Sequence, residues 1–223
     1  MNRGATRRVL SKLEQENPDV PAAIHLIKAQ DYDAYRKKHL LVAQIEGMPS
    51  NDVKELTYLE PIITSFGYQF SNVNFKDGLS LNAAITLKTT EPEGCWPDII
   101  YLVAHGSPSG VQCEFESSIG SGSHHLDWAK LTEGFVGLST ANILFLASCR
   151  TGFKQAAEAL FRVKAAKYLI APRYFVKPSQ LGCAFHTFLY NLEIRGDDIA
   201  TAIRKAEEAS GISLAFYDHG DFL

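Results

Sequence analysis

Two side chains that could act together in catalysis follow apolar runs of the sequence. His105 ends the run DIIYLVAH, and Cys149 ends the run NILFLASC. A cysteine thiol becomes a strong nucleophile when an imidazole takes its proton, and the start of a helix nearby favours the thiolate. The segment GFKQAAEALFRV, which begins at Gly152, has apolar residues at helical spacing. If His105 lies beside Cys149, the thiol has both an imidazole to take its proton and the start of a helix to favour the thiolate.

The elements that would position these residues alternate along the chain between apolar runs and helical segments. This order predicts right-handed βαβ crossovers and a mainly parallel sheet. Since most of the runs are apolar throughout, we expect an α/β fold with helices on both faces of the sheet. The expected strands are HLLVAQIEG, YQFSNVNF, DIIYLVAHG, NILFLASC, AKYLIAPRYFV and, as a candidate last strand, ISLAFYDHGDFL.

The distance between the two residues in the sequence fits one crossover. His105 and Cys149 lie 44 residues apart, with a hairpin-like piece, VQCEFE, and a helical segment, LDWAKLTEGF, between them. Neighbouring parallel strands need a connection of at least this kind. Functional groups of such sheets gather at the carboxyl ends of the strands. The sequence therefore predicts that His105 and Cys149 emerge at the same edge of the sheet.

Gly106 follows the histidine and suggests a role of its own. Without a side chain, its backbone N–H can approach a substrate carbonyl and act as an oxyanion donor beside the N–H of Cys149. Two simpler readings stay open at this point. A cysteine at a strand end commonly packs in the core, and His-Gly is common in turns.

Other reactive side chains fit a catalytic role less well. Cys113 lies in the hairpin-like piece, but no helix starts after it. His124 and His125 are expected in an exposed loop rich in glycine and serine. Cys183 is expected to pack within a helix, and His186 is expected in the core or at its boundary.

The composition bounds the class of protein. The chain has 223 residues, of which 46% are hydrophobic, and this suits one α/β domain with a large core. Its net charge of −3 argues against binding nucleic acid in bulk. No apolar stretch reaches the roughly 18 residues of a membrane span, and the N-terminus lacks the apolar centre of a signal peptide. The four cysteines form no CxxC pair, so we expect reduced thiols, no zinc and a cytoplasmic protein.

The composition changes at His39. Residues 1–38 are read as a helical, polar N-terminal extension, and residues 39–223 as one catalytic domain. The extension could pack against this domain or dock a partner.

The two reactive blocks resemble those of the caspase-like cysteine peptidases. YLVAHGS followed by NILFLASCRTG has that family's layout, an apolar strand ending in His-Gly and then an apolar strand ending in small-x-Cys. DDIATAIRKAEEAS followed by ISLAFYDHGD is similar to the closing helix and strand of the CHAT-domain branch. The resemblance covers about residues 39–220.

This resemblance implies a caspase-like, three-layer α/β/α fold and a cysteine endopeptidase with a protein substrate. Cys149 would attack the scissile carbonyl, and His105 would activate the thiol or protonate the leaving amine. The backbone N–H groups of Gly106 and Cys149 would form the oxyanion hole, and no metal or cofactor would take part. The resemblance also implies activation by a protein partner or a larger effector complex in bacterial stress or antiviral defence. From the charge and the lack of a long apolar stretch, we expect no direct binding to nucleic acid or membrane.

The specificity of the family does not carry over to this chain. Relatives of the metacaspase type place an acidic residue two positions before the cysteine, which helps to select basic substrates. Here that position is Ala147, so this determinant is missing. Arg150 and Arg173 could favour an acidic substrate residue, or they could be solvated or structural arginines.

Two other functions stay open. A caspase-like fold could serve as a catalytically silent scaffold or binding module, although His105 and Cys149 are both present. A flavodoxin-like binding domain would need a glycine-rich phosphate loop after the first strand, where IEGMPSND stands instead.

Overall fold

The computed structural model describes residues 38–48, 56–90, 96–117 and 120–222. The chain divides into two compact units, residues 1–37 and 38–223, and every described residue belongs to the second unit. The expected helical extension of residues 1–38, apart from Lys38, therefore lies outside the described residues. Its docking role stays a prediction.

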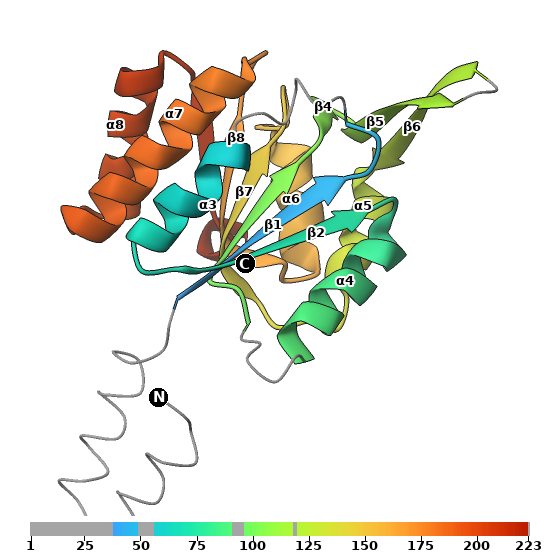
Figure 1. Cartoon of the computed structure of the whole chain (residues 1–223), viewed down its shortest axis with the longest axis horizontal. Helices are drawn as coiled ribbons and strands as arrows, with labels where there is room; N and C mark the ends of the chain where they lie inside the picture. Colours follow the sequence, from blue (N-terminus) through green and yellow to red (C-terminus); the bar gives the residue numbers. More distant parts are fainter. Residues whose placement is uncertain (1–37, 49–55, 91–95, 118–119, 223) are drawn as a thin grey trace, which may run out of the picture. The chain divides into compact units, whose positions relative to one another are not determined.

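The second unit is built on a six-stranded sheet with the strand order β2-β1-β3-β7-β8-β9 (Figure 1). The first five of these strands are parallel, and β9 lies antiparallel beside β8. The expected mainly parallel sheet is confirmed, and β3 and β7 are neighbours as the crossover length predicts. The strands are β1 (His39–Ile45), β2 (Gln69–Phe75), β3 (Ile99–Val103), β7 (Ala141–Ala147), β8 (Ala166–Pro172) and β9 (Leu214–Asp218).

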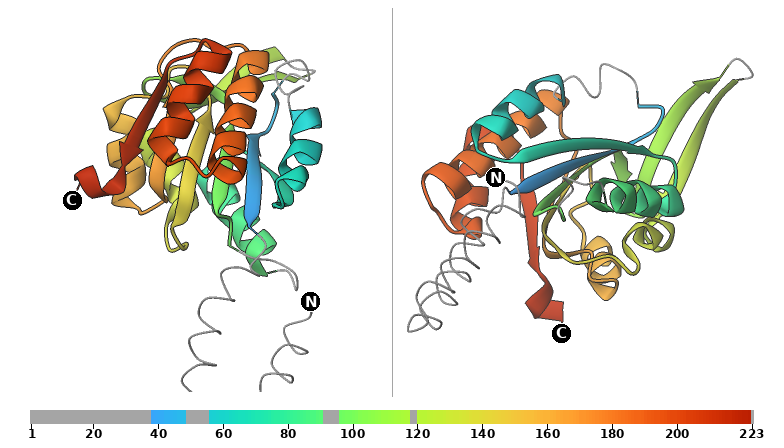
Figure 2. Two further views of the ribbon diagram at one scale, coloured as in Figure 1. Left: turned by 90° about the vertical axis from the view of Figure 1, so that its left-hand side faces the viewer. Right: turned by 60° about the horizontal axis from the view of Figure 1, so that its bottom comes forward.

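Helices cover both faces of the sheet and make three layers (Figure 2). Helices α3, α7 and α8 share one buried apolar cluster with the sheet, and α4, α5 and α6 share the other. None of the helices in the described ranges is both long and apolar enough to cross a membrane. The helices are α3 (Leu56–Ser65), α4 (Gly78–Thr90), α5 (Trp128–Thr132), α6 (Lys154–Arg162), α7 (Pro178–Leu189) and α8 (Ile199–Ser210), with shorter turns at Glu133–Phe135, Tyr190–Ile194 and His219–Phe222.

The side chains of β3 and β7 alternate between the two clusters, because successive residues of a strand point to opposite faces. Tyr101 and Phe145 are fully buried register partners on the side of α7. Their rings stack with 5.4 Å between centroids. The same alternation places Val103 and Ala147, the last residues of the two strands, on the side of α7.

A second, antiparallel sheet follows β3 and contains β4 (His105–Ser107), β5 (Gly110–Ser117) and β6 (Gly120–Asp127). Figure 1 shows β5 and β6 as a ribbon that stands off the rest of the sheet and helices. The hairpin expected from VQCEFE is confirmed. The expected loop around His124 and His125 is wrong, because these residues belong to β6. Glycine and serine form strands poorly on their own, and here the ladder with β5 overrides that preference.

Candidate active site

The pairing of β3 with β7 leads to both reactive residues. Val103 is the register partner of Ala147, and both belong to the apolar cluster on the side of α7. Two residues past this pair, one chain reaches His105 and the other reaches Cys149. Strand β3 ends at Val103 and strand β7 ends at Ala147, and neighbouring strands lie about 4.8 Å apart. The register thus brings two half-buried residues, one with an imidazole and one with a thiol, to one edge of the sheet.

The backbone after His105 stays in contact with the backbone of the cysteine. A Cβ added to Gly106 would lie 2.1 Å from the carbonyl oxygen of Cys149 and 2.9 Å from its nitrogen. Both distances are too short for a real contact, so only glycine fits at this position. We expected the missing side chain to make room for a substrate. The structure adds a packing reason, which is the close approach of Cys149 itself.

Cys149 lies in a tight turn between β7 and α6. Arg150 has a φ of 56°, in the left-handed region that residues other than glycine rarely adopt. The N–H of Arg150 donates to the carbonyl of Tyr174 at 3.1 Å, and the N–H of Gly152 donates to the carbonyl of Pro172 at 2.8 Å. These bonds tie the turn to the chain that leaves β8. The helix expected from Gly152 onward is α6, which begins at Lys154, after this turn.

The thiol lies against a segment that the sequence did not connect with the site. Strand β8 ends at Pro172, so the expectation that RYFV continues this strand is wrong. The N–H of Val176 donates to the sulfur of Cys149 at 3.4 Å, and the thiol donates to the carbonyl oxygen of Val176 at 3.5 Å. The backbone of one residue thus covers the sulfur, and the thiol proton faces a carbonyl oxygen.

The same segment carries two aromatic side chains that are open to solvent. Tyr174 is 67% exposed and Phe175 is 75% exposed. The guanidinium of Arg150 lies over the ring of Phe175, 5.2 Å from its centroid. This cation–π contact gives Arg150 a structural role that needs no acidic substrate residue. Arg173 is exposed at the start of the segment.

The other candidate side chains do not join this site. Cys183 and His186 are both exposed on α7, so the expectation that they pack in or near the core is wrong. The helix turns them away from its buried face. His125 is exposed, and the side chains of Cys113 and His124 lie outside the described part of the chain. Within the described ranges, no three His, Cys, Asp or Glu side chains gather as metal ligands would.

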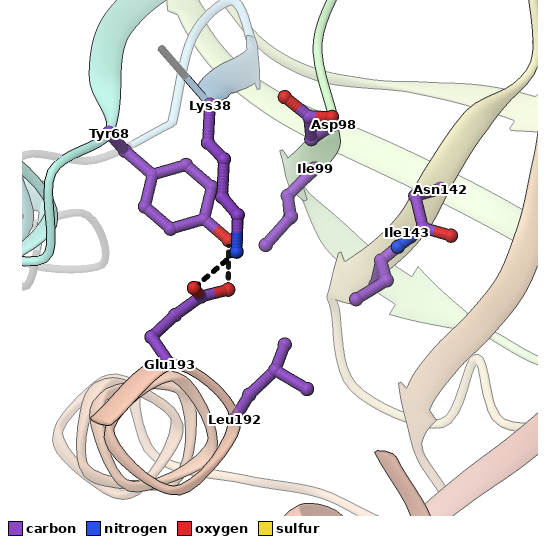
Figure 3. A pocket seen from close by; sticks show the side chains of 8 residues that line it. All are labelled: Lys38, Tyr68, Asp98, Ile99, Asn142, Ile143, Leu192 and Glu193. Atoms are coloured by element: carbon purple, nitrogen blue, oxygen red, sulfur yellow. Dashed lines mark hydrogen bonds and ion pairs between the residues drawn. The ribbon is translucent and has the colours of Figure 1, made fainter. Parts of the chain in front are cut away.

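A small pocket of about 180 Å³ lies at the opposite edge of the sheet, at the amino ends of β1, β3 and β7 (Figure 3). The hydroxyl of Tyr68 donates to Glu193 there at 2.6 Å, and Lys38 pairs with the same carboxylate. Burial, and then this hydrogen bond, raise the pKa of Tyr68 and keep the phenol neutral. Lys38 and Glu193 are engaged with each other, and Asp98 accepts from the N–H of His39 at 2.9 Å, which favours a structural role.

Comparison with known proteins supports the fold through structure and not through sequence. No protein-family model matches the chain, and no curated protein matches it. Among the solved structures that match is a secreted C11 cysteine protease from Bacteroides thetaiotaomicron, in complex with an irreversible peptide inhibitor. The TM-score is 0.59 at 10% sequence identity, and the match covers 82% of this chain and 67% of that chain. The predicted caspase-like α/β fold is confirmed, and the assignment to the CHAT branch stays a prediction.

Proposed function

We propose that the chain is a cysteine peptidase in which Cys149 is the nucleophile and His105 transfers the protons. The observation that carries the proposal is the register of β3 and β7, which leads to both residues at one edge of the sheet. The close approach of Gly106 to the backbone of Cys149 supports the same arrangement. The fold adds support, because a C11 cysteine protease shares it.

In the proposed reaction, the imidazole of His105 takes the thiol proton, and the sulfur of Cys149 attacks the carbonyl carbon of a peptide bond. The C–S bond forms while the carbonyl oxygen becomes an oxyanion. The imidazolium then gives its proton to the amine as the C–N bond breaks, which leaves a thioester on Cys149. A water molecule that loses a proton to the imidazole hydrolyses the thioester and restores the thiol.

The proposed oxyanion donors are the backbone N–H groups of Gly106 and Cys149. A Cβ on Gly106 would lie only 2.9 Å from the nitrogen of Cys149, and this closeness of the two backbones supports the pairing of the two donors. Removal of one donor from such a pair costs about 100- to 1000-fold in rate in other peptidases.

The backbone of Val176 over the sulfur supports a latent resting state. Cys149 is half-buried, and movement of residues 173–177 would open its sulfur further to a peptide carbonyl. An activating protein partner would supply that movement. The resemblance to the CHAT branch alone supports the further proposal of a cytoplasmic enzyme that cleaves a protein substrate in bacterial stress or antiviral defence.

Digestion of a diverse peptide library tests the proposal. The full-length wild type, Cys149→Ala and His105→Ala are incubated with the library, and new peptide ends are identified by mass spectrometry. Phe175→Ala is added because it removes the ring under Arg150 and loosens the segment over the thiol. We expect cleavage that requires both Cys149 and His105. Cleavage that persists in Cys149→Ala, or no cleavage by either the wild type or Phe175→Ala, contradicts the proposal.

A further inference from the structure

Thr151 is a buried side chain beside the proposed site that the reaction does not use. It is fully buried, at 0% exposure, two residues after Cys149. Its hydroxyl donates to the carbonyl oxygen of Ser148 at 2.8 Å. Its methyl carbon lies 2.8 Å from the position that a Cβ on Gly106 would occupy. The methyl group therefore packs on the glycine that follows His105.

These two contacts reach both halves of the proposed dyad. The hydrogen bond links Thr151 back to Ser148 and closes a tight loop around Cys149. The methyl group lies against Gly106, at the strand end that carries His105. Threonine can maintain both contacts at once, because its branched Cβ restricts the side chain to few rotamers.

The turn around the cysteine needs such a constraint. Arg150 holds a left-handed conformation, with a φ of 56°, and a residue of this kind keeps it only when its surroundings fix it. The carbonyl oxygen of Thr151 also accepts from the N–H of Phe153 at 2.9 Å. Thr151 is thus fixed through its side chain on one side of the turn and through its backbone on the other.

We infer that Thr151 is a positioning residue whose hydroxyl, bonded to the carbonyl oxygen of Ser148, fixes the turn that carries Cys149 and so sets the thiol for proton transfer to His105. The inference rests on the proposed function, because it assigns Thr151 a role in the His105–Cys149 pair. A displacement of about 1 Å between reacting groups can cost about a hundredfold in rate. Loss of the hydroxyl therefore alters the reactivity of the thiol in a molecule that still folds.

Alkylation of the full-length protein by iodoacetamide tests the inference without requiring peptide cleavage. Thr151→Val keeps the shape of the side chain and loses the hydroxyl, whereas Thr151→Ser keeps the hydroxyl and loses the methyl group. Ser148→Ala is the matched control, because Ser148 is 2% exposed and its hydroxyl has no hydrogen-bond partner among the described residues. Mass spectrometry gives the rate at Cys149 as a function of pH, and the exposed thiol of Cys183 reports general reactivity in the same molecule.

We expect Thr151→Val to slow alkylation of Cys149 by about tenfold and to move its pH profile upward, since the imidazole no longer assists the thiol. Thr151→Ser stays within about threefold of the wild type, and Ser148→Ala matches it. Because Thr151 acts through the dyad, the effect disappears in a His105→Ala background, where Thr151→Val has no further consequence.

Three results would overturn the inference. These are a wild-type profile in Thr151→Val, an equal loss in Thr151→Ser, and a loss in Thr151→Val that persists in the His105→Ala background. Each leaves the proposed function standing as long as His105→Ala alone slows the alkylation of Cys149. If His105→Ala leaves that rate unchanged, the proposed function fails, and the inference fails with it.

Discussion

Replacement of Gly106 by alanine acts directly on the contact between the two strand ends. The new Cβ would lie 2.1 Å from the carbonyl oxygen of Cys149 and 2.8 Å from the methyl carbon of Thr151. Ordinary contact begins at 3.4 Å, so the two backbones must separate by about 1.3 Å along the shorter contact. Rotation of a side chain cannot relieve this, because the atom in the way belongs to the backbone. We expect a loss of about 1–3 kcal/mol in the free energy of unfolding, and about a hundredfold slower reaction of Cys149 with electrophiles.

Urea unfolding measures the first effect, and mass spectrometry of alkylation at Cys149, relative to the exposed Cys183, measures the second. Gly220→Ala is the matched control, because its Cβ would meet its nearest neighbour, Asp218, at the ordinary distance of 3.4 Å. We expect this variant to change neither quantity. A folded Gly106→Ala variant in which Cys149 reacts at the wild-type rate would refute the idea that this contact holds the site together.

Other contacts give smaller and separable effects. Tyr68→Phe removes a hydrogen bond to a carboxylate and should cost about 1.5–3 kcal/mol in unfolding free energy at neutral pH. The pKa of Tyr68 is raised in the folded state, so its contribution to the free energy of unfolding is complete below the unfolded pKa of about 10 and is lost as the pH rises above that value. Urea unfolding should show this alkaline loss of stability in the wild type and not in Tyr68→Phe. Lys164 is exposed with a φ of 56°, a backbone conformation that glycine adopts more easily. Lys164→Gly should therefore raise the free energy of unfolding by about 0.5–1 kcal/mol, and a variant less stable than the wild type in urea would contradict this. Phe175→Ala removes a cation–π contact with Arg150 that is worth about 0.5–1 kcal/mol and should speed alkylation of Cys149 by about two- to fivefold, whereas an unchanged rate would show that the segment does not limit access.

The layers of the fold and the sheet edge at which His105 and Cys149 lie could be predicted because their signals are local. Every residue of β3 is buried, and an apolar strand of this kind is typical of a sheet covered on both faces. The crossover rule then places the next strand beside it, so His105 and Cys149 follow from their positions at the strand ends. The close contact at Gly106 needed the structure, since a glycine in the sequence does not show which neighbour excludes its side chain.

The remaining parts of the site depend on contacts that carry no local signal. Val176 meets the thiol from 27 residues further along the chain, and its hydrogen bonds use only backbone atoms. The aromatic residues Tyr174 and Phe175 favour a strand by composition, although here the strand ends at Pro172. Glycine and serine disfavour a strand by composition, so β6 was not expected, although it pairs with β5 in the structure.

The alignment of Cys149 with His105 is tested most directly by labelling with peptide-based electrophiles. The full-length wild type, His105→Ala and Cys149→Ala are treated with a panel of such reagents, and the modified residue and its rate are determined by mass spectrometry. An adduct on Cys149 that forms about a hundredfold more slowly in His105→Ala is the predicted result, since an imidazole base contributes at least that factor. Labelling of Cys149 at the same rate without His105, or selective labelling of another cysteine, would contradict the account.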